Sequence, residues 1–143
     1  MAPDPEVVEA LAATDLFGSL NRRALRRVAG TARVVTHEPG KRITTEGEDG
    51  IAFHLILDGS ATVTLGEGVR HTMGKGDYFG EISMIDGEPR SATVTVDKPM
   101  RSAAITAWDF RPLLDEEPAI AKAMLQVLCR RIRGSVPAQA APA

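Results

Sequence analysis

The segment from Phe79 to Val94, FGEISMIDGEPRSATV, carries the residue types with the clearest chemistry in the chain. Gly80 has no Cβ, so a ligand can approach the backbone there, and the turn can adopt dihedrals that other residues resist. Glu81 is expected to open a short helical turn, 81–85, whose first N–H groups lack intrahelical partners and suit an anion. The Glu81 carboxylate is a poor partner for a phosphate but a good acceptor for a sugar hydroxyl. This half of the segment therefore predicts contacts to a sugar.

The second half of the segment supplies the complementary group. Arg90 presents a planar, permanently charged fork that binds two phosphate oxygens at once. Pro89 fixes the backbone just before it, and Ser91 and Ala92 are small enough to leave their N–H groups accessible. Together the two halves predict a pocket for a phosphate attached to a sugar. The alternative, a structural ion pair between the acid and the arginine, explains neither the glycine nor the small residues.

Composition limits the classes of protein to consider. The chain of 143 residues is long enough for one domain with its own core and has little room for a second. Its formal net charge of −2 argues against direct nucleic-acid binding through bulk electrostatics. The single cysteine, Cys129, excludes an intramolecular disulfide and a cysteine-based zinc cluster. No apolar run has the length of a membrane span, and the first residues lack a basic leader region, so we expect a cytoplasmic protein with no membrane partner.

The N-terminal part of the chain has helical patterns. Asp4 followed by Pro5 is typical of a helix start, and apolar residues then recur on one face to about Ala13. Ser19 is expected to cap a second helix that ends at Gly30. We therefore predict an N-terminal helical segment over residues 1–30.

The middle of the chain changes to the period of strands. Short apolar runs alternate with turn signals such as Asp58–Gly59 and Asp86–Gly87. The predicted strands are Arg33 to His37, Arg42 to Thr45, Ala52 to Asp58, Ser60 to Leu65, Val69 to Met73, Ala92 to Val96 and Arg101 to Ile105. Short strands at nearly even spacing with glycine corners predict an antiparallel roll or barrel over residues 31–105.

Helical patterns return after the strands. Thr106 is expected to cap a helix from Ala107 to about Glu116, with Trp108 and Phe110 packed against the roll. A last helix is expected to begin at Pro118 and to end at Gly134. Its predicted apolar stripe consists of Ala121, Met124, Leu125, Leu128 and Ile132. The predicted C-terminal helical part therefore covers residues 106–134, and residues 135–143 are expected to be a disordered tail.

The segment from Phe79 to Val94 resembles the phosphate-binding cassette of the cyclic nucleotide-binding domains found in catabolite-activator-type regulators, kinase regulatory subunits and gated channels. The family pattern is close to F-G-E-[LIV]-[AS]-L, a few variable residues, and P-R-[STA]-A-T-V, and only Ser83 and Met84 depart mildly from its commonest form. The resemblance extends over most of the chain, roughly from Leu11 to Arg133. It implies a mainly β fold, an antiparallel β-roll or jelly roll with N-terminal helices and C-terminal lid helices.

The resemblance also implies a ligand and the roles of particular residues. It places Glu81 on the 2′-hydroxyl of a ribose, Arg90 on the cyclic phosphate, and Ser91 and Ala92 beside that phosphate. The other residues that it assigns to the ligand are Val63, Phe79, Gly80, Ile82 and Ser83. We expect cAMP rather than cGMP, although a serine at position 91 occurs in binders of either nucleotide.

The last helix is the moving lid in this family, and its far end can cover the base. Arg130, Arg131, Arg133 and Ser135 are the candidate lid residues. A plain charged helix end, favoured by the helix dipole, is the competing interpretation of these arginines. Gly134 and Pro137 are expected to end the helix early, so the lid is expected to be short.

Other chemistry-bearing residues have simpler interpretations. Arg22, Arg23, Arg26 and Arg27 are read as a solvated helix face rather than a surface for DNA or membrane. His37, His54 and His71 lack the spacing of a metal site and are expected on strand surfaces or in the core, and Cys129 is expected to be at least half-buried. No nucleophile and base are placed for catalysis, so we expect neither an enzyme nor a cofactor or metal.

The leading hypothesis is a regulatory module that captures a cyclic nucleotide and repositions its C-terminal helix against an unknown effector protein. The alternatives are the effector domain of a transcription regulator, the sensor of a larger enzyme or channel, and a fold relative that has lost nucleotide binding and engages a protein. A start at Met1 and an Ala/Pro/Gln-rich end fit a free-standing protein or a chain cut within a linker. A monomer is favoured over a homodimer because the roll could cover the apolar stripe of the last helix.

Overall fold

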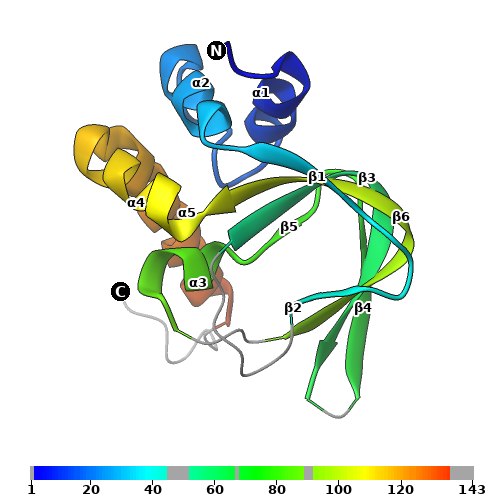
Figure 1. The fold of residues 1–143 in the computed structure, drawn as a ribbon. Helices are drawn as coiled ribbons and strands as arrows, with labels where there is room; N and C mark the ends of the chain where they lie inside the picture. Colours follow the sequence, from blue (N-terminus) through cyan, green and yellow to red (C-terminus); the bar gives the residue numbers. More distant parts are fainter. Residues whose placement is uncertain (1, 45–51, 67, 89–91, 136–143) are drawn as a thin grey trace.

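The computed structural model describes residues 2–44, 52–66, 68–88 and 92–135. The strands curl into a roll on one side of the molecule, and the helices gather at one end of it (Figure 1). The helices are α1 (Pro5–Ala12), α2 (Arg22–Gly30), α3 (Glu81–Asp86), α4 (Ala107–Glu116) and α5 (Pro118–Ser135). The strands are β1 (Arg33–His37), β2 (Arg42–Thr44), β3 (Ala52–Leu65), β4 (Val69–Gly74), β5 (Tyr78–Phe79) and β6 (Thr93–Thr106).

The strands pair antiparallel in the order β1-β6-β3-β4, with β2 added to β6 and β5 added to β3. The long strands β3 and β6 form the centre of the sheet, because they run side by side from Ala52 opposite Thr106 to Thr64 opposite Thr93. This antiparallel sheet with flanking helices confirms the predicted fold class. Among the described residues, none of the helices is both long and apolar enough to cross a membrane.

Two strand boundaries predicted from the sequence are wrong. The expected turn at Asp58–Gly59 is a bulge within the continuous strand β3, where the register against β6 shifts. Gly59 has a φ of +90°, and a Cβ built there would lie 2.3 Å from the carbonyl oxygen of Pro99 and 2.6 Å from Cα of Met100. The glycine is therefore needed for a close crossing of β3 and β6, and β6 is likewise one strand where two were predicted.

The core has two parts. Inside the roll, the buried hydrophobic cluster consists of Ile56, Ala61, Val63, Met73, Phe79, Val94, Val96 and Met100. A second cluster lies where the helices pack on the end of the sheet, and in it the ring of Phe17 meets the rings of Phe53 and Phe110 edge to face, 5.8 and 6.2 Å between centroids. The helices thus close one end of the roll and fix β3 and β6 there.

Most of the predicted helix starts are confirmed. The Asp4 side chain accepts a hydrogen bond from the backbone N–H of Glu6, and the Thr106 hydroxyl accepts one from Asp109. The predicted Ser19 cap is wrong, because α2 begins later and Asn21 caps it by accepting from the N–H of Ala24.

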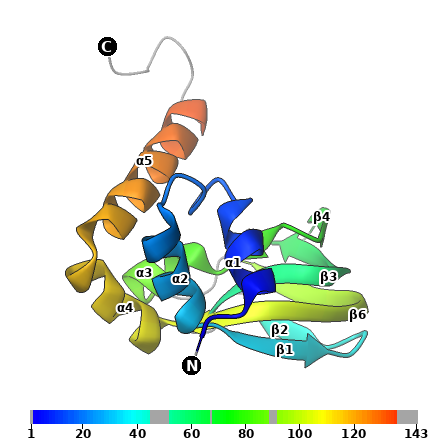
Figure 2. The same ribbon diagram turned by 90° about the horizontal axis from the view of Figure 1, so that it is seen from above.

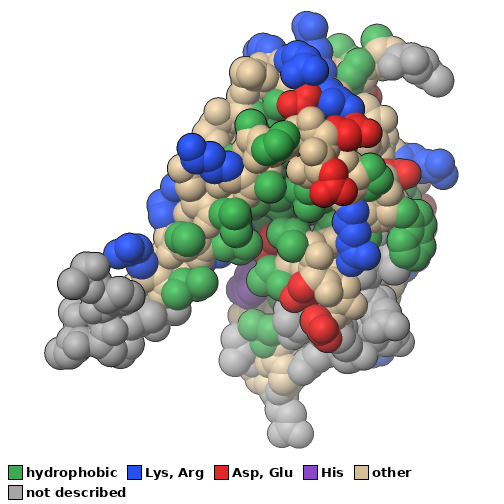
Figure 3. Space-filling view, turned by 90° about the vertical axis from the view of Figure 1, so that its left-hand side faces the viewer, with side chains coloured by type: hydrophobic (Ala, Val, Ile, Leu, Met, Phe, Trp, Pro, Cys, Tyr) green, Lys and Arg blue, Asp and Glu red, His purple; other side chains and the backbone are tan. Residues whose placement is uncertain are grey.

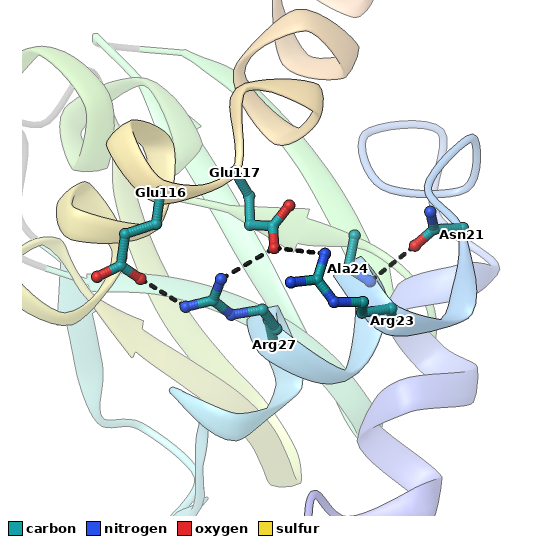
Figure 4. Close-up of polar contacts among 6 residues, drawn as sticks. All are labelled: Asn21, Arg23, Ala24, Arg27, Glu116 and Glu117. Carbon is teal, nitrogen blue, oxygen red and sulfur yellow. Dashed lines mark hydrogen bonds and ion pairs between the residues drawn. The ribbon is translucent and has the colours of Figure 1, made fainter.

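The arginine run on α2 contacts the junction of α4 and α5 (Figure 4). Arg27 donates to Glu116 at 2.5 Å and to Glu117 at 2.9 Å, and Arg23 also contacts Glu117 at 2.9 Å. On the other side of the helix, Arg22 pairs with Glu9 of α1. These arginines link helices to one another, so the interpretation as a purely solvated face is too simple.

Helix α5 packs on the molecule with a face that shares only Met124 with the predicted stripe. Its buried residues are Ile120, Ala123, Met124 and Val127. Leu125 and Ile132 are 61% and 62% exposed, and green hydrophobic side chains follow the projecting arm in Figure 3. The reason given for a monomer, that the roll covers the stripe, therefore does not hold.

Two further packing predictions are corrected. Phe110 is buried as expected, but Trp108 is 65% exposed and does not pack in the core. Cys129 is exposed, not half-buried, because it lies on the outer side of α5. The predicted tail and the predicted strand end at Thr45 lie outside the described residues, apart from Ser135 at the end of α5.

Candidate functional site

The predicted turn after Phe79 is present and begins with an unusual backbone. Gly80 has φ 87° and ψ 4°, in the left-handed region that favours glycine, and it precedes the short helix α3. The first hydrogen bond of this turn runs from the N–H of Met84 to the carbonyl of Gly80, at 3.0 Å. The chain therefore leaves the sheet at β5 and turns sharply, which places Glu81 at the mouth of the roll.

A cavity of about 220 Å³ opens beside this turn. Seven of the nine residues that the sequence assigned to a ligand line it, namely Val63, Phe79, Gly80, Glu81, Ile82, Ser83 and Ala92. The other two, Arg90 and Ser91, lie outside the described residues, together with Pro89. The structure thus gathers strand, turn and helix residues around one hollow.

Five more residues line the same cavity and were not predicted: Leu65, His71, Met73, Tyr78 and Val94. Val63 faces His71 across the β3–β4 pair. Because side chains alternate along a strand, Leu65 and Met73 then share the face of Val63 and His71. The alternating pattern of the two strands is the signal that could have found these residues once their register was known.

Glu81 is the carboxylate of the cavity, and its side chain is only 14% exposed. Its Oε1 accepts a hydrogen bond from Nη1 of Arg131 at 2.8 Å. Arg131 also donates to the hydroxyl of Tyr78, and its guanidinium carbon lies 5.6 Å from the centre of the tyrosine ring. The acid is thus paired with an arginine of α5, fifty positions further along the chain.

Tyr78 continues this chain of contacts toward the N-terminal helices. Its hydroxyl donates to Oδ1 of Asp15 at 2.5 Å. Burial, followed by this hydrogen bond, raises the pKa of Tyr78 well above its usual range. The phenol is therefore neutral at physiological pH and can donate to Asp15 while it accepts from Arg131.

The candidate lid residues differ in position. Arg131 reaches the cavity wall through Glu81, whereas Arg130 and Arg133 are exposed on α5. Ser135 is the last residue of the helix, and its side chain lies outside what the structure describes. Among the predicted lid residues with a described side chain, Arg131 is therefore the one that contacts the site.

The histidines lie on strands, two of them in the core. His37 and His54 are 6% and 8% exposed, and Nε2 of His37 and Nδ1 of His54 lie 2.9 and 3.0 Å from the Ser102 hydroxyl oxygen. The His54 ring stacks on Phe79 of the cavity, with 5.1 Å between centroids. His71 is exposed and lines the cavity, so the histidines serve packing and the cavity wall.

Comparison with known proteins agrees with this geometry. Residues 34–117 match the family model of the cyclic nucleotide-binding domain. The chain is 44% identical over 100 residues to a cAMP-dependent protein kinase regulatory subunit of Yarrowia lipolytica, an alignment that covers 68% of this chain and 26% of the relative. It is 33% identical over 112 residues to a cyclic nucleotide-gated potassium channel of Mesorhizobium japonicum, covering 78% and 31%.

A solved structure is similar as well. The crystal structure of the N-terminal domain of a transcriptional regulator from Streptomyces coelicolor superimposes with a TM-score of 0.76 at 26% identity, covering 88% of this chain and 92% of that one. The chain spans only about a quarter to a third of the kinase subunit and the channel that it matches. With the family model matched over more than half of its length, the chain belongs to the cyclic nucleotide-binding domain family.

Proposed function

We propose that this domain is a regulatory module that binds a 3′,5′-cyclic nucleotide, cAMP in preference to cGMP, and signals through α5. The observation that carries the proposal is the cavity, since seven of the nine residues that the family resemblance assigns to the ligand line it together. Its volume of about 220 Å³ is below the ~300 Å³ of the smallest pockets that enclose a whole drug-sized ligand. The sugar and phosphate would therefore lie inside, and the base would extend toward the opening.

The proposed contacts follow from the chemistry of the residues. Glu81 accepts a hydrogen bond from the ribose 2′-hydroxyl through Oε2, the carboxylate oxygen that does not pair with Arg131. Arg90 binds the cyclic phosphate, with Ser91 and Ala92 beside it, as the cassette pattern implies. Val63 and Phe79 supply apolar contact to the sugar and base, since both are buried in the wall of the cavity.

The preference for cAMP and the role as a sensor rest on the relatives. The fungal regulatory subunit is named for its dependence on cAMP. Because the chain matches only a part of each of those proteins, we propose that it acts as the sensor for an effector protein and is not itself an enzyme. The effector domain of a transcription regulator is the second candidate, which the similarity to the Streptomyces N-terminal domain favours.

Replacing the phosphate-binding arginine tests the proposal. We expect Arg90→Ala to weaken cAMP binding by about 3 kcal/mol or more, on the order of a hundredfold, because a desolvated phosphate would lose its charged partner. Titration calorimetry on protein that has been unfolded, stripped of nucleotide and refolded measures this loss, with cGMP as the second ligand.

The matched control is Arg22→Ala, which removes an exposed arginine on α2 whose partner is Glu9. It should leave the affinity for cAMP unchanged. Equal affinities in wild type and Arg90→Ala would contradict the proposed phosphate site, and tighter binding of cGMP would contradict the assignment of the base.

A further inference from the structure

Two buried histidines share one hydroxyl group next to the candidate site. His37 lies in β1, Ser102 in β6 and His54 in β3. Nε2 of His37 and Nδ1 of His54 lie 2.9 and 3.0 Å from the hydroxyl oxygen of Ser102. The serine is fully buried, and both histidines are nearly so. The three side chains therefore form one polar cluster inside the roll.

The protons of this cluster fit two neutral rings. A hydroxyl group donates one hydrogen bond, so Ser102 donates to one of the two ring nitrogens and accepts from the other. Nδ1 of His37 has no hydrogen-bond partner among the described residues. Because buried N–H groups without an acceptor are rarer than unpaired acceptors, we place the proton of His37 on Nε2, from which it donates to Ser102. A second proton on His37 would then lie on Nδ1, where no described group accepts it.

The surroundings of His37 also oppose a positive charge on its ring. Burial, followed by the positive charge of Lys41 in the turn after β1, lowers the pKa of His37. The polar groups that face the ring from β6 and β3 are Ser102 and His54, and neither is an acid. The ring is therefore neutral at physiological pH and takes up a proton only in acid.

The cluster ends at the wall of the cavity. His54 lies opposite Phe79 in the β3–β5 pair, and the two rings stack with 5.1 Å between centroids and 19° between planes. Phe79 is buried, lines the cavity and directly precedes the turn at Gly80. The Phe79 ring is therefore supported by the His54 ring, which is in turn held by the hydroxyl of Ser102.

His37 lies at a place where the sheet can yield. Figure 2 shows β1 at one edge of the sheet, and β6 is its partner strand among the described residues. His37 is also the last residue of β1. A charged His37 ring can therefore move toward solvent with less disruption than a ring in the central strands β3 and β6. Its departure would remove the N–H group from which Ser102 accepts, and would loosen the hold of Ser102 on His54.

We propose that the His37–Ser102–His54 cluster positions Phe79 for the ligand, so that uptake of a proton by His37 weakens nucleotide binding. The three residues of the cluster are then positioning residues, which act on the ligand through Phe79. This inference rests on the proposed function and extends it to the regulation of the same site. By linkage, a bound nucleotide favours the neutral cluster, and binding in acid releases a proton from His37.

Titration calorimetry with cAMP at pH 7.5 and at pH 5.5 tests the inference in the whole chain. A histidine with the usual pKa of 6.5 that had to be neutral for binding would weaken the affinity roughly tenfold over this range. Because the pKa of His37 is lowered, the loss is smaller. His37→Gln keeps an N–H group for Ser102 and cannot be protonated. We expect the loss of affinity between the two pH values to be about threefold larger in wild type than in this variant.

His71→Gln separates this route from a direct one. His71 is exposed on the cavity wall, where its protonation would bring a positive charge near the ligand without involving the cluster. Whatever its affinity at pH 7.5, this variant should keep the wild-type ratio of affinities between the two pH values. Equal ratios in wild type and His37→Gln would overturn the inference, and so would a pH dependence that is lost in His71→Gln.

NMR titration of the histidine rings gives a second readout, because the chain has three histidines and the two variants assign them. The pKa of His37 should be lower with saturating cAMP than without it, since the nucleotide favours the neutral ring, and an unchanged pKa overturns the coupling. If wild type binds neither cAMP nor cGMP at pH 7.5, the proposed function fails and the coupling fails with it. Binding with the same affinity at both pH values overturns this inference alone.

Discussion

His37 is a buried titratable group in the core of the roll. Its Nε2 lies beside the Ser102 hydroxyl, its ring meets that of His54 at 5.7 Å between centroids, and its Nδ1 has no hydrogen-bond partner in the described part of the chain. Burial, with a smaller contribution from the positive charge of Lys41, lowers the pKa of His37 from its usual value of 6.5. The folded protein therefore holds this histidine neutral where the unfolded chain would already be protonated.

This shift predicts a loss of stability in acid. As the pH falls below about 6.5, the unfolded chain binds the proton first, so the free energy of unfolding decreases until the folded His37 is protonated too. Above that pH, His37 adds no pH dependence to the free energy of unfolding. We expect His37→Gln to lower the free energy of unfolding by about 1 kcal/mol at pH 7.5. Between pH 7.5 and pH 5.5, the free energy of unfolding of the variant should decrease less steeply than that of wild type, as measured by urea unfolding at each pH. Parallel curves for the two proteins would contradict this account of His37.

At the scale of the elements, the crossing of β3 and β6 depends on one glycine. Gly59 has backbone atoms of Pro99 and Met100 within 3 Å of the position of a Cβ, whereas Gly40 has a similar φ of +86° and no atom within 4 Å. Gly59→Ala should therefore lower the free energy of unfolding by about 3 kcal/mol or more. Gly40→Ala, the matched control, should cost only the strain of the left-handed backbone, about 1 kcal/mol. Similar losses in urea unfolding would show that the close crossing is not what requires Gly59.

Element types and most of their bounds followed from local signals in the sequence. The caps at Asp4 and Thr106 and the helix start at Pro118 are set by residues next to them in the chain, and the structure has them as predicted. The split of β3 at Gly59 was wrong because an Asp–Gly pair signals a turn and a bulge alike. Which one forms is decided by the neighbouring strand, which is distant in sequence.

The face of α5 shows the same limit. Apolar residues occur on two sides of this helix, so periodicity alone could not select the buried set that includes Ile120 and Val127. The turn at Gly80 and the cavity-lining residues beside it, Phe79 to Ser83, were predicted from a contiguous motif, because they are close in sequence. The pairing of Arg131 with Glu81 and the contact of Tyr78 with Asp15 join residues fifty or more positions apart, and no local pattern specifies them.

On the scale of the whole molecule, binding at the cavity should be visible as stability. A ligand that binds only the folded chain stabilises it by about 2.7 kcal/mol at a free concentration a hundredfold above its dissociation constant. We therefore expect cAMP to raise the thermal unfolding midpoint of wild type, and to do so much less in Arg90→Ala at the same concentration. An equal rise in both proteins would place the stabilising nucleotide outside the cassette.

The central claim is that this domain binds a cyclic nucleotide in the cavity beside Glu81. Its most direct test is calorimetric titration of stripped and refolded wild-type protein with cAMP, performed at two temperatures because a heat of binding cannot vanish at both when apolar surface is buried. We predict saturable binding with one nucleotide per chain. The absence of heat at both temperatures, for cAMP and for cGMP, would contradict the claim and would favour a fold relative that engages a protein partner instead.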